Sequence, residues 1–401
     1  MSSNGKHEPL ILSTARTPIG KFRSALGGVP ISDLAATAVR AAVERAGLAG
    51  SDEFDEVLMG NVVSAGAGQN IARQSAIFGG LPVTVGATTV NKVCGSGLKT
   101  VVLAAQAIRA GDGSLFVAGG VESMSRAPYL VDGRMGELKY GNVTLKDSLQ
   151  VDGLWCPFED WGMGSAAEFI AEEYEVTREA MDRYALGSQE KAVAAIDRGD
   201  FKEEIVPVEI RSRRGTTVVD ADEGPRRDTS LEALAALTPV FKSDGKITAG
   251  NAPGLNDGAA AVVVASAEKA AALGAQPLAR IVGYAQAAID PKYIFAAPAI
   301  AIPRLLEKVG WTFAEVDLIE LNEAFAAQVL ANGYEMADLG WDWEKLNVNG
   351  GAIALGHPLG ATGARILTTL VHALKHRNLE RGIASLCLGG AEAVAVAVEM
   401  I

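Results

Sequence analysis

The sequence predicts an α/β fold made of two similar halves separated by an insertion. Short apolar segments typical of buried strands alternate with longer amphipathic segments typical of helices, both near the start and near the end of the chain. Such alternation is the pattern of layered α/β proteins. From about residue 126 to about residue 245 the chain is instead polar and charged. We therefore expect an N-terminal half at residues 1–125 and 246–274, an inserted segment at 126–245, and a C-terminal half at 275–401.

The order of motifs in the first half returns in the second. Each half has an asparagine directly after an apolar strand, then a valine–asparagine pair, and then an apolar strand that ends in two glycines. Asn61 and Asn322 are 261 residues apart, Asn91 and Asn349 are 258 apart, and Gly119 and Gly389 are 270 apart. Similar spacings indicate a duplicated α/β unit. The alternative is that unrelated α/β units share these generic signals.

Local signals place the individual elements of the N-terminal half. Ser32 and Asp33 can cap a helix that Gly47 ends. Apolar runs bounded by glycine or polar residues predict short strands. The expected strands are residues 10–12, 56–59 and 114–118, and the expected helices are residues 32–46, 71–78 and 98–110.

The rest of the chain follows the same rules. The inserted segment has one helical section, which covers residues 165–194 and continues to 200. A buried strand returns after the insertion, and further strands and a long helix follow it. The strands are expected at residues 259–266, 279–284, 318–322 and 383–386, and the helix at 364–375.

Composition limits the class of protein. The chain has 401 residues, 49% of them hydrophobic, and a formal charge of −12. This acidity argues against a nucleic-acid surface and favours a soluble protein. Three cysteines do not form a disulfide framework, no secretory signal is visible, and no apolar run is long enough for a membrane span. We therefore expect a cytoplasmic protein without nucleic-acid or membrane partners.

Cys94 is the first candidate for chemistry. It lies between an expected strand and the start of an amphipathic helix, with Gly95 and Gly97 after it. The helix dipole and free N–H groups at such a position favour a thiolate, and the glycines leave space for a substrate. The alternative is a buried cysteine that acts only as a small hydrophobic residue.

His357 is the strongest candidate among the four histidines. It lies in a loop rich in glycine and proline, residues 349–360. Stiff loops on a rigid scaffold often carry catalytic groups, and an imidazole can take a proton from a thiol and later bind an oxyanion. A histidine that only stabilises the loop is the alternative.

Two further side chains lie at strand ends. Cys387 precedes Gly389 and could exchange a proton at carbon, or could be a core cysteine. Asn322 could hold a water or an oxyanion, or could cap the next helix. Strand ends that point the same way are the usual ligand site of α/β sheets.

Two clusters have an ordinary explanation and a functional one. His372 and His376 are four residues apart on one helical face, which is a spacing that can bind a metal. No third ligand lies nearby in the sequence, so we expect a surface pair and no metal site. Five arginines gather in the insertion and either form a solvated face or bind a phosphate group. They are Arg211, Arg213, Arg214, Arg226 and Arg227.

Four motifs together resemble those of the thiolases. They are residues 90–97 around Cys94, residues 322–326, residues 350–363 around His357, and residues 387–390. The similarity runs from Ala15 nearly to the C-terminus. It implies two thiolase halves in an α-β-α-β-α layered arrangement, with an inserted loop domain over the active site.

The resemblance also implies roles. Cys94 would carry the acyl group, His357 would activate it, and Cys387 would move a proton at the α-carbon of acetyl-CoA. Asn322, through a water, and His357 would form one oxyanion hole, and the backbone N–H groups of Cys94 and Gly389 the other. Coenzyme A would be a substrate rather than a permanently bound cofactor. It would contact Arg226, Met163, Phe241, Ala249 and Phe325.

The resemblance thus implies a homodimeric or homotetrameric acetyl-CoA C-acyltransferase, with acetoacetyl-CoA as favoured substrate. Three residues depart from the family pattern: Ala391 replaces a glycine, Pro253 a serine, and Gly162 a histidine often found in acetoacetyl-CoA thiolases. One alternative is a decarboxylating ketosynthase, which usually has histidine where Asn322 stands. A non-catalytic thiolase-like scaffold or acyl-carrier partner is the other.

Overall fold

The computed structural model describes residues 3–131, 133, 140–213 and 215–401. Its main sheet consists of two groups of strands with the same plan. In the N-terminal half, β3 is parallel to β4 and β5, and β12 is antiparallel to β5 and β1. The order is β4 (Gly86–Val90), β3 (Glu56–Gly60), β5 (Leu115–Ser123), β12 (Asn256–Ser266) and β1 (Pro9–Arg16).

The C-terminal half repeats this order. Here β14 is parallel to β15, and β16 is antiparallel to β15 and β13. Leu346 makes a parallel bridge to Ile319, where β4 would lie in the other half. The order is β14 (Leu318–Leu321), β15 (Arg381–Leu388), β16 (Glu392–Met400) and β13 (Ala279–Ala288). The halves meet where β1 pairs with β13 over two residues, Leu10 with Arg280 and Ile11 with Ala279.

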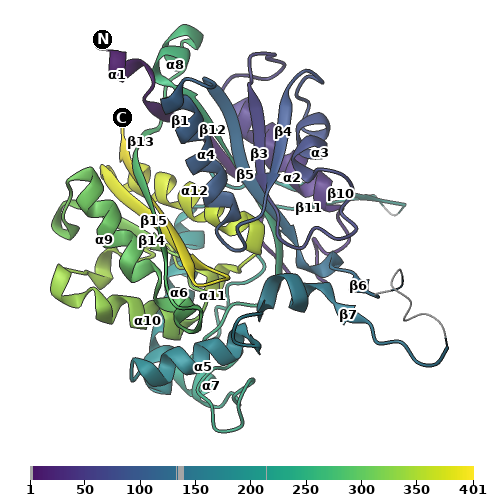
Figure 1. Ribbon diagram of the computed structural model, residues 1–401, viewed down its shortest axis with the longest axis vertical. Coiled ribbons are helices and arrows are strands. Elements are labelled where there is room, and N and C mark those ends of the chain that lie inside the picture. The colour runs from purple at the N-terminus through teal and green to yellow at the C-terminus, as the bar shows by residue number, and fades with distance from the viewer. Residues whose placement is uncertain (1–2, 132, 134–139, 214) are drawn as a thin grey trace.

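Helices fill the space between the two groups of strands and cover their outer faces, as Figure 1 shows. Both α4 and α12 lie in the middle, where α12 contacts α4, β5, β12 and β15. The outer helices α2 and α3 cover the N-terminal strands, and α9 covers the C-terminal ones. This confirms the layered α/β fold. The bounds are α2 (Ile31–Arg45), α3 (Ile71–Phe78), α4 (Ser96–Ala110), α9 (Pro298–Val309), α10 (Ala326–Glu335) and α12 (Leu359–Arg377).

Strand sequences explain why both faces are covered. In β12, Val263 contributes to the core under α2, whereas its neighbours Val262 and Val264 contribute to the central core with α4 and α12. In β16, Val394 and Val396 likewise face the central core, and Ala395 faces α9. Successive side chains of a strand point to opposite faces, so a strand apolar at every position needs a layer on each side.

Residues 126–245, which we call the loop domain, form mainly helices and short hairpins. We expected one helical section at residues 165–200, but the structure divides it into two helices, one that ends at Glu173 and one that begins at Arg178. The side chain of Thr177 caps the second by accepting from the N–H of Ala180. Its elements are β6 (Tyr129–Leu130), β7 (Lys146–Asp147), β8 (Trp155–Cys156), β9 (Trp161–Gly162), α5 (Met163–Glu173), α6 (Arg178–Arg198), β10 (Val208–Ser212), β11 (Gly215–Val219) and α7 (Leu231–Ala235).

Another local expectation was wrong. Ser32 and Asp33 do not cap α2, because Pro30 is the N-cap residue and no side chain bonds there. Proline's fixed φ suits the start of a helix. The remaining elements are α1 (Ser3–Lys6), β2 (Gly20–Lys21), α8 (Ala267–Leu273) and α11 (Ala352–Leu355). Short 3₁₀ helices lie at 124–126, 291–296, 313–315, 337–339 and 343–345, and a short π-helix lies at 149–154. No helix among the described residues is long and apolar enough to cross a membrane.

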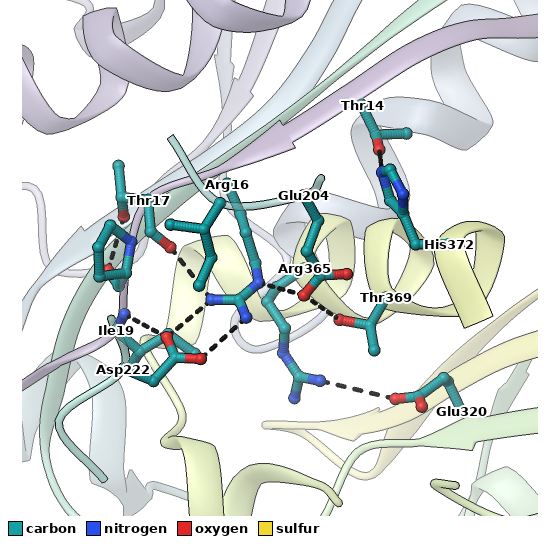
Figure 2. Close-up of polar contacts among 12 residues, drawn as sticks. Thr14, Arg16, Thr17, Ile19, Glu204, Asp222, Glu320, Arg365, Thr369 and His372 are labelled. Atoms are coloured by element: carbon teal, nitrogen blue, oxygen red, sulfur yellow. Dashed lines mark hydrogen bonds and ion pairs between the residues drawn. The ribbon is translucent and has the colours of Figure 1, made fainter. Parts of the chain in front are cut away.

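A buried arginine ties the loop domain to the first strand. Arg16, at the end of β1, donates to Glu204 Oε1 at 2.6 Å and to both carboxylate oxygens of Asp222 at 2.7 and 2.8 Å (Figure 2). Asp222 also accepts from the backbone N–H of Ile19. A buried arginine needs such pairing, because an unpaired charge is costly to bury. These bonds hold the loop domain against the C-terminal end of β1.

Candidate active site

One cavity of about 450 Å³ brings together residues from both halves and the loop domain. Cys94, His357, Cys387 and Gly389 all line it. Asn322 lies behind His357, with its Nδ2 at 3.4 Å from His357 Nε2. All five residues expected to be catalytic therefore lie in or directly behind one site, although they come from four separate parts of the sequence.

Cys94 lies in a tight, strained loop between β4 and α4. Val93, just before it, has a φ of 47°, which is unusual for a β-branched residue. Asn91 Oδ1 accepts from the N–H of Val93 at 3.0 Å, and Ser96 Oγ donates to its carbonyl at 2.6 Å. A Cβ at Gly95 would collide with Leu388. These contacts hold the loop, and strain of this kind is often found at functional sites.

The loop before α12 holds His357 by its backbone and its ring. The N–H of His357 donates to Asn256 Oδ1 at 2.9 Å. Its Nδ1 lies 2.7 Å from Thr362 Oγ1, and that hydroxyl donates to the carbonyl of Pro358 at 2.9 Å. A hydroxyl has one hydrogen, so His357 must donate from Nδ1. The neutral ring then keeps an unprotonated Nε2, which faces Asn322 and can accept a proton.

Burial sets the protonation of the site. It raises the pKa of Cys94 to about 12, while the backbone N–H groups of Cys94 and Gly389, near the sulfur, act in the opposite direction. Burial, aided by the charge of Arg365, lowers the pKa of His357 to about 3. The expectation that Cys94 ionises easily was therefore wrong, because the loss of solvation raises the pKa of the thiol more than the start of the helix lowers it.

Cys387 is buried at the end of β15, and burial together with the nearby Cys94 sulfur raises the pKa of its thiol. The two thiols and the imidazole are thus neutral before substrate binds. Asn322 Oδ1 is buried and has no hydrogen-bond partner among the described residues. It is free to accept a hydrogen bond from a water or a ligand.

Sequence reasoning missed one residue that organises the site. Glu122, at the end of β5, is fully buried and accepts four hydrogen bonds. They come from Asn61 Nδ2 and from the N–H groups of Val62, Val63 and Gly360. Glu122 therefore links the N-terminal half to the loop that carries His357. Its position in the repeat, opposite Glu392, was the only signal in the sequence.

Glycines allow the two catalytic loops to approach each other. A Cβ on Gly97, at the start of α4, would lie 2.8 Å from the carbonyl oxygen of Gly360 and 2.9 Å from the nitrogen of Ala364. Cβ atoms on Gly120 or Gly363 would collide with backbone of the opposite half. The first turns of α4 and α12 thus touch backbone to backbone, close to Cys94 and His357.

Of the five residues expected to contact coenzyme A, three line the catalytic cavity. Met163, Phe241 and Phe325 line the cavity. Arg226 and Ala249 are exposed and do not line it, so their contact with coenzyme A stays a prediction. Of the other arginines, Arg227 pairs with Asp197 and Arg211 with Glu209, while position 214 lies outside the described residues.

Two family models match the chain almost from end to end. The model described as thiolase, N-terminal domain, matches residues 10–268, and that described as thiolase, C-terminal domain, matches residues 275–400. This chain belongs to the thiolase family. The gap between the matched ranges, residues 269–274, covers most of α8 and comes just before β13, the first strand of the C-terminal half.

Individual thiolases and a solved structure agree with this. The chain is 52% identical to an acetyl-CoA acetyltransferase of Pseudomonas aeruginosa over 96% of this chain and 98% of that one. It is 54% identical to a probable acetyl-CoA acetyltransferase of Escherichia coli, over 97% and 98%. The crystal structure of the Bacillus anthracis acetyl-CoA acetyltransferase covers all of both chains, with a TM-score of 0.95 and 45% identity.

This thiolase places its three departures around the site. Pro253 and Gly162 line the cavity, so both can affect how an acyl-CoA fits. Ala391 is buried behind Cys387 with a φ of 61°, a conformation in which glycine would be unstrained. The turn therefore forms despite the extra Cβ.

Proposed function

We propose that this thiolase is an acetyl-CoA C-acetyltransferase. It joins two acetyl-CoA molecules to acetoacetyl-CoA and free coenzyme A, and in reverse it cleaves a 3-oxoacyl-CoA. The observation that carries the proposal is the single cavity shared by Cys94, His357 and Cys387, with Asn322 directly behind His357. The names of the relatives support the choice of acetyl-CoA.

In the first half-reaction, the sulfur of Cys94 attacks the thioester carbon of acetyl-CoA while His357 Nε2 takes the thiol proton. A neutral thiol and a neutral, desolvated imidazole suit this coupled transfer, because neither has to be charged beforehand. The N–H groups of Cys94 and Gly389 stabilise the tetrahedral oxyanion. Coenzyme A leaves with a proton from Cys387, which remains as a thiolate. Acetyl-Cys94 and protonated His357 result.

In the second half-reaction, the Cys387 thiolate removes a proton from the α-carbon of a second acetyl-CoA. Protonated His357, with Asn322 through a water, stabilises the enolate oxygen. The enolate carbon attacks the acetyl group, and the Cys94–carbon bond breaks. Cys94 recovers its proton from His357, so each group ends in its starting state. The thioester with Cys94 keeps the acetyl carbon electrophilic until the second substrate arrives.

The test is the mass of the intact protein after incubation with acetyl-CoA. We expect one acetyl adduct on the wild type and none on Cys94→Ala. Cys387→Ala should form the adduct more slowly, because coenzyme A must then take its proton from water, and should lose condensation, because it lacks the base for the α-proton. A wild type without adduct, or an adduct retained in Cys94→Ala, would reject the proposal.

The same experiment separates the alternatives. A non-catalytic scaffold has no turnover for Cys387→Ala to lose, and a decarboxylating ketosynthase would require a malonyl thioester. A rate series over 3-oxoacyl-CoA chain lengths then tests whether acetoacetyl-CoA is the favoured substrate, given Gly162 and Pro253 in the cavity wall.

We also propose a homodimer or homotetramer in the cytoplasm. Strand β4 is the last strand of the sheet, and no strand among the described residues pairs with its outer edge. Phe78 and Val83 are exposed close to it in the sequence. An open edge with apolar neighbours suits pairing with a second copy. The cytoplasm is proposed because the three cysteines are free and the proposed chemistry needs two of them as reduced thiols, which a reducing compartment maintains. Light scattering on the purified protein gives the oligomeric state.

A further inference from the structure

Three potential metal ligands meet at the C-terminal end of α12, away from the catalytic cavity. They are Glu203, from the loop domain, with His372 and His376 from α12. One ligand atom of each lies within 4.8 Å of the others. Glu203 Oε2 is 3.9 Å from His372 Nδ1 and 3.8 Å from His376 Nε2. The sequence showed the histidine pair, but only the fold brings in the carboxylate.

His372 is held as a metal ligand usually is. Its side chain is 8% exposed, and its Nε2 lies 3.1 Å from Thr14 Oγ1, as Figure 2 shows. Its Nδ1 is buried and has no hydrogen-bond partner among the described residues. A buried polar atom without a partner needs an explanation. Here that atom is the one directed at Glu203, and the other nitrogen has the hydrogen bond that orients a ligating ring.

Other charges bear on the same place. The ammonium group of Lys375 lies 2.7 Å from Glu203 Oε2, and the guanidinium of Arg45 is near His372. Both oppose a second cation. The last carbonyl groups of α12 favour one, since the C-terminal end of a helix carries partial negative charge. Lys375 therefore acts as a competitor that a metal ion must displace from the carboxylate.

We propose that Glu203, His372 and His376 form a site for a divalent transition metal such as Zn²⁺. Two imidazoles and one carboxylate are a common zinc ligand set, with bonds of about 2.0–2.2 Å. Such bonds place ligand atoms roughly 3.4 Å apart. The two separations between Glu203 and the histidines therefore need to close by about half an ångström, and that between the two imidazole nitrogens, which is within 4.8 Å, by up to about 1.4 Å. None of the three residues lines the catalytic cavity. The ion would clamp the loop domain to α12, the helix whose N-terminal loop carries His357.

The experiment measures Zn²⁺ bound to the full-length protein after treatment with a chelator, by equilibrium dialysis and metal counting. The variants are His376→Ala and Glu203→Gln, both at exposed positions. The matched control is His7→Ala, a histidine in the turn between α1 and β1. Cys94→Ser and Cys387→Ser are run in parallel, because zinc can also bind thiolates.

We expect the wild type and His7→Ala to bind one equivalent of Zn²⁺. The variants His376→Ala and Glu203→Gln should lose it, and the two cysteine variants should keep it. Zinc should raise the melting temperature of the wild type but not of His376→Ala. Lys375→Ala should bind zinc several-fold more tightly, because the competing ammonium is gone. Equal binding by wild type and His376→Ala, or loss only in the cysteine variants, would overturn the proposal.

Discussion

The hydroxyl oxygen of Thr362 lies 2.7 Å from Nδ1 of His357 and donates its own hydrogen to the carbonyl of Pro358. This pair fixes which ring nitrogen carries the proton. The unprotonated Nε2 is the one that faces Asn322 and the catalytic cavity. A residue one turn into α12 thus orients the base without contact to substrate.

Replacing Thr362 by valine should lower kcat about 10- to 100-fold, as loss of a supporting hydrogen bond to a ligating or catalytic histidine often does. The shape of the side chain is nearly unchanged, so KM should change little. Steady-state kinetics measure both. Thr362→Ser keeps the hydroxyl and should restore most of the rate; an equally slow serine variant would show that the methyl group matters instead.

Replacing Gly97 by alanine should separate the starts of α4 and α12. The new Cβ would meet backbone atoms at 2.8 and 2.9 Å, and forced overpacking costs about 1–3 kcal/mol. Chemical denaturation should show this loss, with reduced acetylation of Cys94. The matched control is Gly187→Ala in α6, where a Cβ meets nothing within 4 Å. That variant should gain roughly 0.5–1 kcal/mol; equal effects of both would contradict the crowding argument.

Replacing Glu122 by glutamine should lower the free energy of unfolding by about 2–3 kcal/mol, because either orientation of the amide turns an NH₂ group toward N–H donors. Each carboxylate oxygen now accepts two of these hydrogen bonds. Its counterpart Glu392 is partly exposed and pairs with Lys92. Glu392→Gln should therefore cost less than about 1 kcal/mol. Denaturation curves of the two variants under identical conditions provide the comparison.

The buried histidines predict a loss of stability in acid. Burial lowers the pKa of His372 to about 3, and the positive charges of Arg45, His376 and Lys375 act in the same direction. The negative charge of Glu203 acts in the opposite direction. Between that value and about 6.5, the unfolded state binds a proton that the native state does not. The free energy of unfolding therefore falls as the pH falls, by up to about 1.4 kcal/mol per pH unit for each such group. His357 acts in the same direction.

His372→Asn tests this in metal-free buffer. Its free energy of unfolding is measured between pH 7 and pH 5. The slope of this free energy against pH should be smaller than that of the wild type by up to about 1.4 kcal/mol per pH unit, which is the contribution of one proton. An unchanged slope would mean that His372 is protonated in the native state.

Much of the architecture was predictable because its signals are local. The strand at Glu56–Gly60, the helix at Ile71–Phe78 and the turn at Cys94 follow from apolar runs, periodicity and glycines within a few residues. The cap of α2 and the break between α5 and α6 could not be predicted, because the ends of helices depend on small energy differences.

By itself the sequence determined the α/β class, the repeated halves, the thiolase motifs and the names of the catalytic candidates. Only the tertiary structure decided what those groups are like: Cys94 and His357 are neutral, Glu122 holds the catalytic loop, and Glu203 joins His372 and His376. The physical reason is that protonation and ligand geometry depend on burial and on neighbours more than a hundred residues away. A local pattern carries no record of either.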